Sequence, residues 1–183
     1  IRDSSSSEAF IEMEKDINRL SIVSERFSKI GSKVDKYPQE IVEFFDNYLV
    51  YMKKRIPKSI VVDSNYQDTI MTANINAPLF SWVIENIIKN AADAMDGKGK
   101  LNISIHKSYN EIIIQITDNG KGIPSSFQKT IFEPGYTTKE RGWGLGLSLS
   151  KRIVEGHHDG KIHVKSSKKG LGTTMELILP SII

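Results

Sequence analysis

The apolar positions near the N-terminus have the spacing of a coiled-coil seam. Between residues 8 and 30, apolar side chains recur at alternating intervals of three and four positions. They are Phe10, Met13, Ile17, Leu20 and Phe27. Ser24 interrupts the seam, and Gly31 suits the end of the helix. Because so narrow a stripe needs a partner helix, we expect a coiled-coil helix here, with packing on its own domain as the alternative.

Two more helices are predicted where a proline precedes an amphipathic run. Pro38 suits the first turn of one helix, which Pro57 would end. Its predicted buried face is Ile41, Phe44, Phe45, Tyr48 and Met52. Pro78 suits the first turn of the next helix, which is expected to run to about residue 95. Its apolar stripe is Phe80, Ile84, Ile87, Ile88, Ala91 and Met95.

Runs of β-branched and alternating residues predict a series of strands, and a further helix is expected over 145–155. The strands are predicted at 59–62, 68–75, 101–107, 111–118, 161–166 and 173–179. A short turn at 108–110 would join two of them into a hairpin. This order of elements predicts an α+β fold, a two-layer α/β sandwich with helices on one face of a mixed sheet, preceded by the coiled-coil-like helix.

Residues 119–145 break this regular pattern. The segment is rich in glycine, holds two prolines and shows little periodicity. A loop of this length inside a compact domain is usually functional or disordered. We therefore look for functional residues within it and beside it.

The composition narrows the class of protein. The chain has 183 residues, enough for one domain with an appendage. Its 25 basic and 22 acidic residues give a net charge of +3, which is too balanced to indicate nucleic-acid binding. It has no cysteine, which excludes disulfides, thiolate zinc sites and cysteine nucleophiles. No apolar run approaches the ~18 residues of a membrane helix. The chain begins without Met and without a signal peptide, so we expect a piece of a longer protein.

Asn86 and Asn90 stand one turn apart on the predicted third helix. Their side chains lie about 40° apart on one flank of the apolar stripe. Two amide oxygens in that position, together with phosphates and water, would suit Mg²⁺, which prefers oxygen ligands. A solvated helix face is the more ordinary explanation of such a pair.

Asp118 ends a strand whose apolar residues alternate like a core face, so its side chain should continue that face. A carboxylate there needs a hydrogen-bond donor, and the exocyclic amine of a nucleobase would serve. Gly120 and Gly122 would let a flat ligand approach the backbone. Taken alone, these residues are slightly better explained by an ordinary turn.

Gly142, Gly144 and Gly146 alternate and lead into the predicted helix at 145–155. They would expose backbone N–H groups at a helix N-terminus, an arrangement that binds phosphate. The segment is neither a P-loop nor a Rossmann loop, because the spacing differs from both. A flexible hinge is the alternative. Residues 170–174 form another glycine-rich segment, where Thr173 could reach a ligand or a water, although such glycines usually mark only a turn.

In their order and spacing, these motifs together resemble the characteristic boxes of sensor histidine kinase catalytic domains. Those catalytic domains belong to a wider superfamily that also includes the ATPase domains of type II topoisomerases. The boxes are Asn86-Ile87-Ile88-Lys89-Asn90-Ala91, Asp118-x-Gly120-x-Gly122, residues 132–139, Gly142-x-Gly144-Leu145-Gly146-Leu147 and Gly172-Thr173. The resemblance covers roughly residues 38–180. The ordered set is a specific signal although each box alone is weak.

The resemblance implies a Bergerat-type fold with ATP and Mg²⁺ as cofactors. It implies that Asp118 bonds the adenine amino group, that Thr173 assists through water, and that Asn90 binds Mg²⁺ with help from Asn86. Residues 121–143 would form the ATP lid. The full implied set of ATP-binding residues is Asn86, Asn90, Asp118, Gly120, Gly122, Ile123, Lys139, Gly142, Gly144, Leu145, Gly146, Leu147 and Thr173.

Asn86 also bears on the expected chemistry. Topoisomerase-type ATPases have a water-activating glutamate at this position. Asn86 therefore argues against efficient hydrolysis and for transfer to another acceptor, and we take it as a catalytic candidate. Glu85, about 100° around the helix, is a second catalytic candidate, which would polarise an acceptor histidine.

The same resemblance divides the chain at residue 34. Residues 1–34 look like part of the dimerisation and phosphotransfer hairpin, with residues 1–7 as a possible added end, and residues 35–183 would be the ATP-binding catalytic domain. We interpret all the histidines as structural or solvated, with an imidazolium at 157 or 158 suiting the end of a helix. They are His106, His157, His158 and His163. The acceptor histidine would then lie outside this chain.

The expected function is that of an ATP-dependent protein histidine kinase of two-component signal transduction. The γ-phosphoryl group would pass to a histidine on the dimerisation hairpin and then to a response regulator receiver domain. We expect a cytoplasmic domain of a homodimeric parent, for which a membrane anchor is left open, without nucleic acid as a partner. One alternative is a related ATPase or serine kinase, which would not need the helix at 8–30. Another is a non-catalytic nucleotide-sensing module, against which the intact segment 132–139 argues.

Overall fold

The computed structural model describes residues 10, 11, 13, 14, 17, 34–67, 70–139 and 142–182. The chain divides into two compact units, Ile1–Asp35 and Lys36–Ile183. In the first unit, the described residues 10, 11, 13, 14 and 17 are helical. The rest of the predicted coiled-coil helix lies outside the described residues, so its pairing stays a prediction. In the part of the chain that is described, no helix is both long and apolar enough to cross a membrane.

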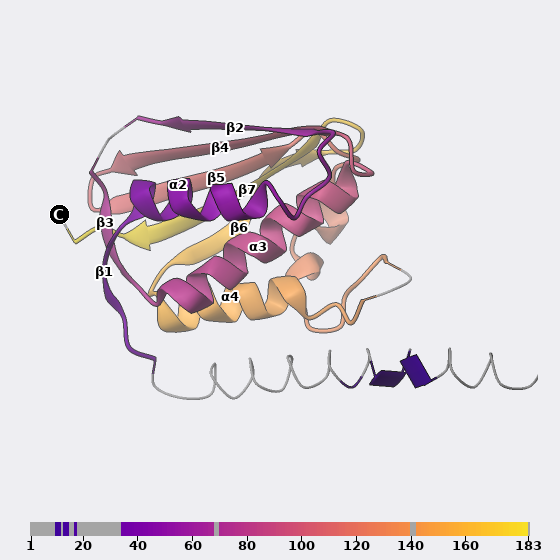
Figure 1. Ribbon diagram of the computed structural model, residues 1–183, viewed down its shortest axis with the longest axis horizontal. Coiled ribbons are helices and arrows are strands. Elements are labelled where there is room, and N and C mark those ends of the chain that lie inside the picture. Colours follow the sequence, from indigo (N-terminus) through magenta and orange to yellow (C-terminus); the bar gives the residue numbers. More distant parts are fainter. Residues whose placement is uncertain are drawn as a thin grey trace, which may run out of the picture. The chain divides into compact units, whose positions relative to one another are not determined.

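The second unit has two layers, with α2, α3 and α4 on one face of a five-stranded sheet (Figure 1). In chain order its elements are β1 Tyr37–Glu40, α2 Ile41–Met52, β2 Ile60–Tyr66, β3 Thr72–Ile75, α3 Ala77–Ala94, β4 Gly99–Ser108, β5 Glu111–Asp118, the 3₁₀ turns η1 Ser125–Phe127 and η2 Thr130–Phe132, α4 Gly146–His157, β6 Lys161–Lys168 and β7 Gly172–Pro180. The strand order is β2-β4-β5-β7-β6, with β2 parallel to β4 and the other pairs antiparallel. The predicted α+β sandwich is confirmed.

The core forms where the apolar faces of helices and strands meet. The predicted stripe of α3 is buried throughout, and the inward residues of β4 and β5 alternate with more exposed ones. Asn76 caps α3 by accepting the N–H of Leu79 at 3.1 Å, and a proline occupies its first turn. The turn between β4 and β5 consists of Tyr109 and Asn110, as the register shows. The helix and the hairpin predicted here are therefore confirmed.

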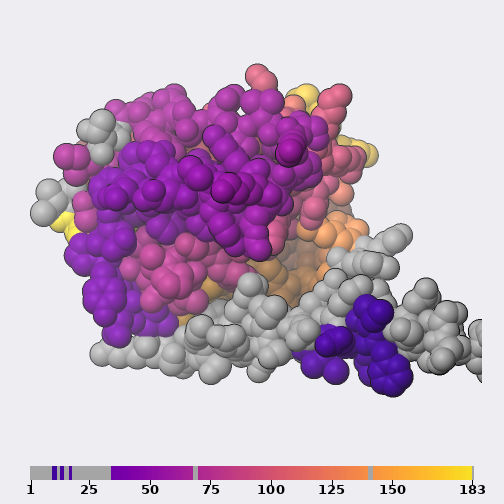
Figure 2. All heavy atoms as spheres, in the orientation of Figure 1, coloured from indigo at the N-terminus to yellow at the C-terminus, as the bar shows by residue number. Residues whose placement is uncertain are grey.

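The start of α2 differs from the prediction. Pro38 lies in β1 and pairs with Asn74 of β3, in a separate two-stranded sheet. The helix begins only after Glu40, whose carboxylate accepts the N–H groups of Glu43 at 2.7 Å and Met71 at 2.8 Å. The placement of Pro38 in a first turn was wrong because this cap depends on a residue 31 positions away. The helix also ends at Met52, before Pro57 is reached. The atoms of α2 cover much of the face seen in Figure 2.

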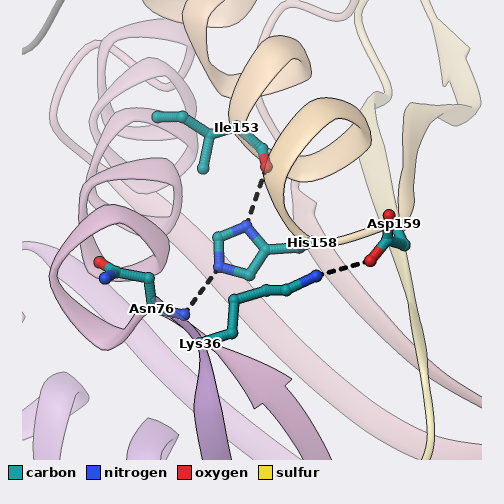
Figure 3. Close-up of polar contacts among 5 residues, drawn as sticks. All are labelled: Lys36, Asn76, Ile153, His158 and Asp159. Atoms are coloured by element: carbon teal, nitrogen blue, oxygen red, sulfur yellow. Dashed lines mark hydrogen bonds and ion pairs between the residues drawn. The ribbon is translucent and has the colours of Figure 1, made fainter. Parts of the chain in front are cut away.

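His158 lies directly after α4, and it is a neutral, buried link between helices. Its exposed fraction is 2%. Nε2 accepts the N–H of Asn76 at 3.0 Å, so Nδ1 carries the proton and donates to the carbonyl oxygen of Ile153 at 2.8 Å (Figure 3). Burial, and next the charges of Lys36 and His157, lower the pKa of His158. The structural role is confirmed, but an imidazolium at this position was wrong.

The lowered pKa of His158 predicts a pH-dependent stability. The unfolded chain binds a proton near the ordinary value of 6.5, while the folded chain resists it. The contribution of His158 is therefore fully present above about pH 6.5 and is lost as the pH falls below it, by up to about 1.4 kcal/mol per pH unit. Urea unfolding from about pH 7.5 to 5.5 should show this slope, and His158→Gln should flatten it. His106→Gln, a change on the opposite phase of β4 from the core, should keep the wild-type slope; equal slopes in all three proteins would contradict the prediction.

Candidate functional site

The centre of the candidate site is Asp118, the last residue of β5. It is 6% exposed and faces Thr173 of β7 in the antiparallel register. Its Oδ1 accepts the N–H of Gly120 at 2.8 Å. Burial raises the pKa of Asp118, and the backbone N–H groups of Gly120 and Thr173 partly oppose that rise. The structure thus brings together Asp118 and Thr173, which lie 55 positions apart (173 − 118). The family resemblance had assigned both to the same ligand.

Gly120 and Gly122 are required by the packing of the protein on itself. A Cβ at Gly120 would meet the carbonyl oxygen of Ala94, at the end of α3, at 2.5 Å. A Cβ at Gly122 would overlap the carbonyl of Lys168, and Gly122 also has a φ of +69°. The N–H of Lys121 donates to the same Ala94 oxygen at 2.9 Å. The loop after Asp118 is therefore clamped between α3 and the end of β6.

Ser167, in β6, connects the loop after Asp118 with the start of β7. It was not predicted from the sequence. Its Oγ accepts the N–H of Ile123 at 2.7 Å and lies 3.0 Å from the carbonyl oxygen of Gly172 and 2.9 Å from Oγ1 of Thr173. The N–H of Ile123, a predicted ATP-binding residue, is thus committed to the protein. A serine in an exposed strand carries no pattern that would have revealed this role.

Asn90 faces the long loop. Its Oδ1 accepts a hydrogen bond from Nζ of Lys139 at 2.8 Å, and Lys139 also pairs with Asp93 at 2.6 Å. The side-chain oxygens of Asn90 and Asp93, both on α3, thus bind the ammonium group of Lys139. This donor set, a neutral amide with a carboxylate one turn further on, fits the oxygen preference of Mg²⁺. Asp93 was not predicted from the sequence.

Asn86 is in a different environment, although it lies on the same flank of α3. Its Nδ2 donates to Oγ of Ser150, in α4, at 3.0 Å. A Cβ at Gly146 would overlap the amide oxygen of Asn86. The side chain of Asn86 thus packs against the first turn of α4, away from the Lys139 contact.

Glu85 lies toward α2 rather than toward the predicted nucleotide site. Its carboxylate pairs with Lys89 at 2.6 Å and with Arg55 at 3.5 Å. Burial, followed by the charge of Glu85, raises the pKa of Tyr48 on α2. Since Glu85 already has these partners, the geometry offers no support for a role in polarising an acceptor, and that role stays a prediction.

The glycine-rich segment before α4 forms the other end of the site. Gly144 has a φ of +64° and its carbonyl oxygen accepts the N–H of Gly135 at 3.1 Å. The helix begins after Leu145, and no side chain of the described residues caps its N-terminus. Uncapped N–H groups at a helix N-terminus attract anions. Gly142 precedes this turn with a φ of +149°, and residues 140–141 lie outside the described part of the chain.

The predicted residues therefore fall into three groups connected by α3. The first group surrounds Asp118 at the end of the sheet, the second is the Asn90–Lys139 pair, and the third is the start of α4 with Asn86 against it. A buried acceptor, a cation-binding amide and an uncapped helix N-terminus together are suited to a nucleoside phosphate with a divalent cation.

The part of the chain that carries these residues matches a known family. A family model described as "Histidine kinase-, DNA gyrase B-, and HSP90-like ATPase" matches residues 76–182. The chain belongs to this family of ATPases. The matched range contains Asp118, Asn86, Asn90 and the glycines described in this site.

Curated proteins that resemble the chain are named as kinases. The signal transduction histidine-protein kinase AtoS of Escherichia coli (strain K12) is 42% identical over 118 residues, 64% of this chain and 19% of AtoS. Sporulation kinase C of Bacillus subtilis (strain 168) is 36% identical over 126 residues, 68% of this chain and 29% of that kinase. The chain thus spans less than a third of the length of either relative.

Solved structures show the same fold. The catalytic domain of histidine kinase ThkA has a TM-score of 0.73 and 25% identity, and the match covers 80% of this chain and 96% of that domain. Full-length ShkA in complex with AMPPNP has a TM-score of 0.82 at 18% identity, covering 99% of this chain and 39% of ShkA, which shows the fold alone. The fold of this family member is that of histidine kinase catalytic domains.

The role of Ser167 gives a prediction for the stability of the site. Ser167→Ala should lower the free energy of unfolding by about 1–3 kcal/mol, because the N–H of Ile123 loses its acceptor. Ser166→Ala, a matched change at an exposed neighbour, should stay within about 0.5 kcal/mol of wild type. Urea midpoints measure both. If the two variants lost the same stability, Ser167 would not be the clamp described here.

Proposed function

We propose that this domain is the ATP-binding catalytic domain of a histidine protein kinase of two-component signal transduction. The observation that carries the proposal is the buried carboxylate of Asp118, held by backbone N–H groups at the end of the sheet. Such a carboxylate is suited to accept the exocyclic N–H of adenine, with Thr173 assisting through a water. Membership in an ATPase family supports this assignment.

The triphosphate would extend from Asp118 toward the start of α4. Gly142, Gly144 and the first turn of α4 from Leu145 to Leu147 would receive the phosphates through backbone N–H groups. Residues 121–143 would act as the lid over the nucleotide, and Lys139 would contribute a phosphate contact. Asn90 would hold Mg²⁺, a cation that neutralises charge on the transferred group.

In the proposed reaction, the γ-phosphoryl group passes in line to a ring nitrogen of a histidine outside this chain. The bond between the γ-phosphorus and the β–γ bridging oxygen breaks, a phosphorus–nitrogen bond forms, the imidazole releases one proton to solvent, and ADP leaves. The residues of this domain would contribute positioning and charge stabilisation, as in other phosphoryl transfers. Asn86 occupies the position of a water-activating glutamate in topoisomerase-type ATPases, which supports transfer over hydrolysis.

The acceptor is proposed to lie on a dimerisation hairpin, of which residues 1–34 would be one part. A phosphorylated hairpin would then donate to a response regulator receiver domain. The name of AtoS, a signal transduction histidine-protein kinase, supports a histidine acceptor. In the full-length protein the hairpin would make a homodimer.

The binding proposal predicts a thermal shift that depends on Asp118. Mg-ADP at ~100 times its dissociation constant should stabilise the domain by ~2.7 kcal/mol, or roughly 5–10 °C for this size. Asp118→Asn should abolish most of this shift, because the amide presents an N–H group where the adenine amine also needs an acceptor. Each protein is compared with itself without nucleotide, so a change in intrinsic stability does not affect the result. The absence of a thermal shift in the wild-type protein at millimolar nucleotide would refute the proposal.

The transfer proposal predicts phosphorylation of a histidine when the domain is joined to a complete hairpin. Radiolabel from γ-³²P-ATP should appear on the hairpin in an acid-labile, base-stable form. His→Gln at the hairpin histidine and Asn90→Ala in the domain should each abolish it. Label that appeared only as free phosphate would instead indicate the alternative, an ATPase of the same family.

A further inference from the structure

The two asparagines on α3 have different partners, and only one of them faces a cation. Asn90 binds the ammonium of Lys139, whereas Asn86 binds the hydroxyl of Ser150 in α4. Both side chains are half-buried, and they lie one turn apart. Their shared residue type and flank therefore do not give them a shared role.

The hydrogen-bond network fixes the orientation of the Asn86 amide. Ser150 is fully buried, and its hydroxyl donates to the carbonyl oxygen of Gly146 one turn earlier at 3.0 Å. With its only proton used, Oγ of Ser150 can accept but not donate. The group of Asn86 that faces it is accordingly the NH₂ group, at 3.0 Å.

Gly146 completes the contact by leaving room for the amide. Any Cβ at this position would overlap the amide oxygen of Asn86. Gly146 does not have a positive φ, unlike Gly142 and Gly144. Its lack of a side chain is therefore explained by the close approach of Asn86 rather than by backbone conformation.

We propose that Asn86 is a positioning residue, which holds the phosphate-binding first turn of α4 in place against α3, and that it is not a ligand of Mg²⁺. This inference rests on the proposed nucleotide site. Asn86 acts through Ser150 and Gly146: the link holds the uncapped N–H groups of the first turn of α4 at a set place relative to Asn90. Preorganised N–H groups bind a phosphate without first being ordered.

Three ligands separate the possible roles on the 183-residue chain. Adenosine reports the adenine side alone, ADP without metal adds the phosphates, and Mg-ADP adds the cation. Affinities come from calorimetry for the nucleotides and from NMR titration for adenosine. The variants are Asn86→Ala, Ser150→Ala, their double variant, and Asn90→Ala as the comparison for a metal ligand.

A positioning role predicts that Asn86→Ala and Ser150→Ala each weaken ADP about tenfold, a change of about 1.4 kcal/mol. The loss should be the same with and without Mg²⁺, adenosine affinity should not change, and the double variant should lose no more than either single one, because both changes break one link. Asn90→Ala should instead lose mainly the gain in affinity that Mg²⁺ provides.

Other outcomes overturn the proposal. If Asn86→Ala lost only the Mg²⁺-dependent gain while Ser150→Ala bound normally, Asn86 would be a metal ligand. If both variants weakened adenosine as much as ADP, the link would merely support the fold. Ile112→Val, a core change at the far end of β5, controls for lost stability and should leave all three affinities unchanged. Wild type that bound none of the ligands would refute the nucleotide site itself, a result distinct from either of these.

Discussion

The candidate site depends on holding one carboxylate, that of Asp118, in a place where water is largely excluded. Burial raises its pKa, and the backbone N–H groups of Gly120 and Thr173 are what stabilise its charged form. An ionised group kept there costs stability that an apolar residue would not. Because the carboxylate is desolvated, it is a strong hydrogen-bond acceptor from which a ligand would displace little water. The group that lowers the stability of the fold is therefore the one suited to accept a hydrogen bond from a ligand.

The surroundings of Asp118 show how the fold keeps that acceptor in place. The turn after β5 is held from one side by the carbonyl oxygen of Ala94 and from the other by Ser167 and the carbonyl of Lys168. These contacts come from the end of α3 and from the edge strand β6, which only β7 separates from β5 in the sheet. The glycines of this turn are thus needed first for the protein to close on itself. A ligand at Asp118 would therefore meet a turn that these contacts already hold in place.

Patterns repeated along one element were predictable from the sequence, and contacts between elements were not. The stripe of α3 and the alternation that buries Asp118 reflect local geometry, so burial could be predicted from spacing alone. The start of α2 could not, because its cap connects Glu40 with Met71 across 31 positions. Ser150 and Ser167 are single hydroxyls without periodicity, and their importance follows only from the neighbours that the fold supplies.

Helix α3 explains how such separate motifs become one site. Asn86, Asn90 and Ala94 follow at intervals of four, so they lie along one flank of the helix. Each contacts a different part of the chain: Asn86 the start of α4, Asn90 the lysine of the long loop, and the Ala94 carbonyl the turn after β5. A rotation of α3 about its axis would disturb all three contacts together. The apolar stripe that fixes this rotation in the core is therefore as much a part of the site as the polar residues beside it.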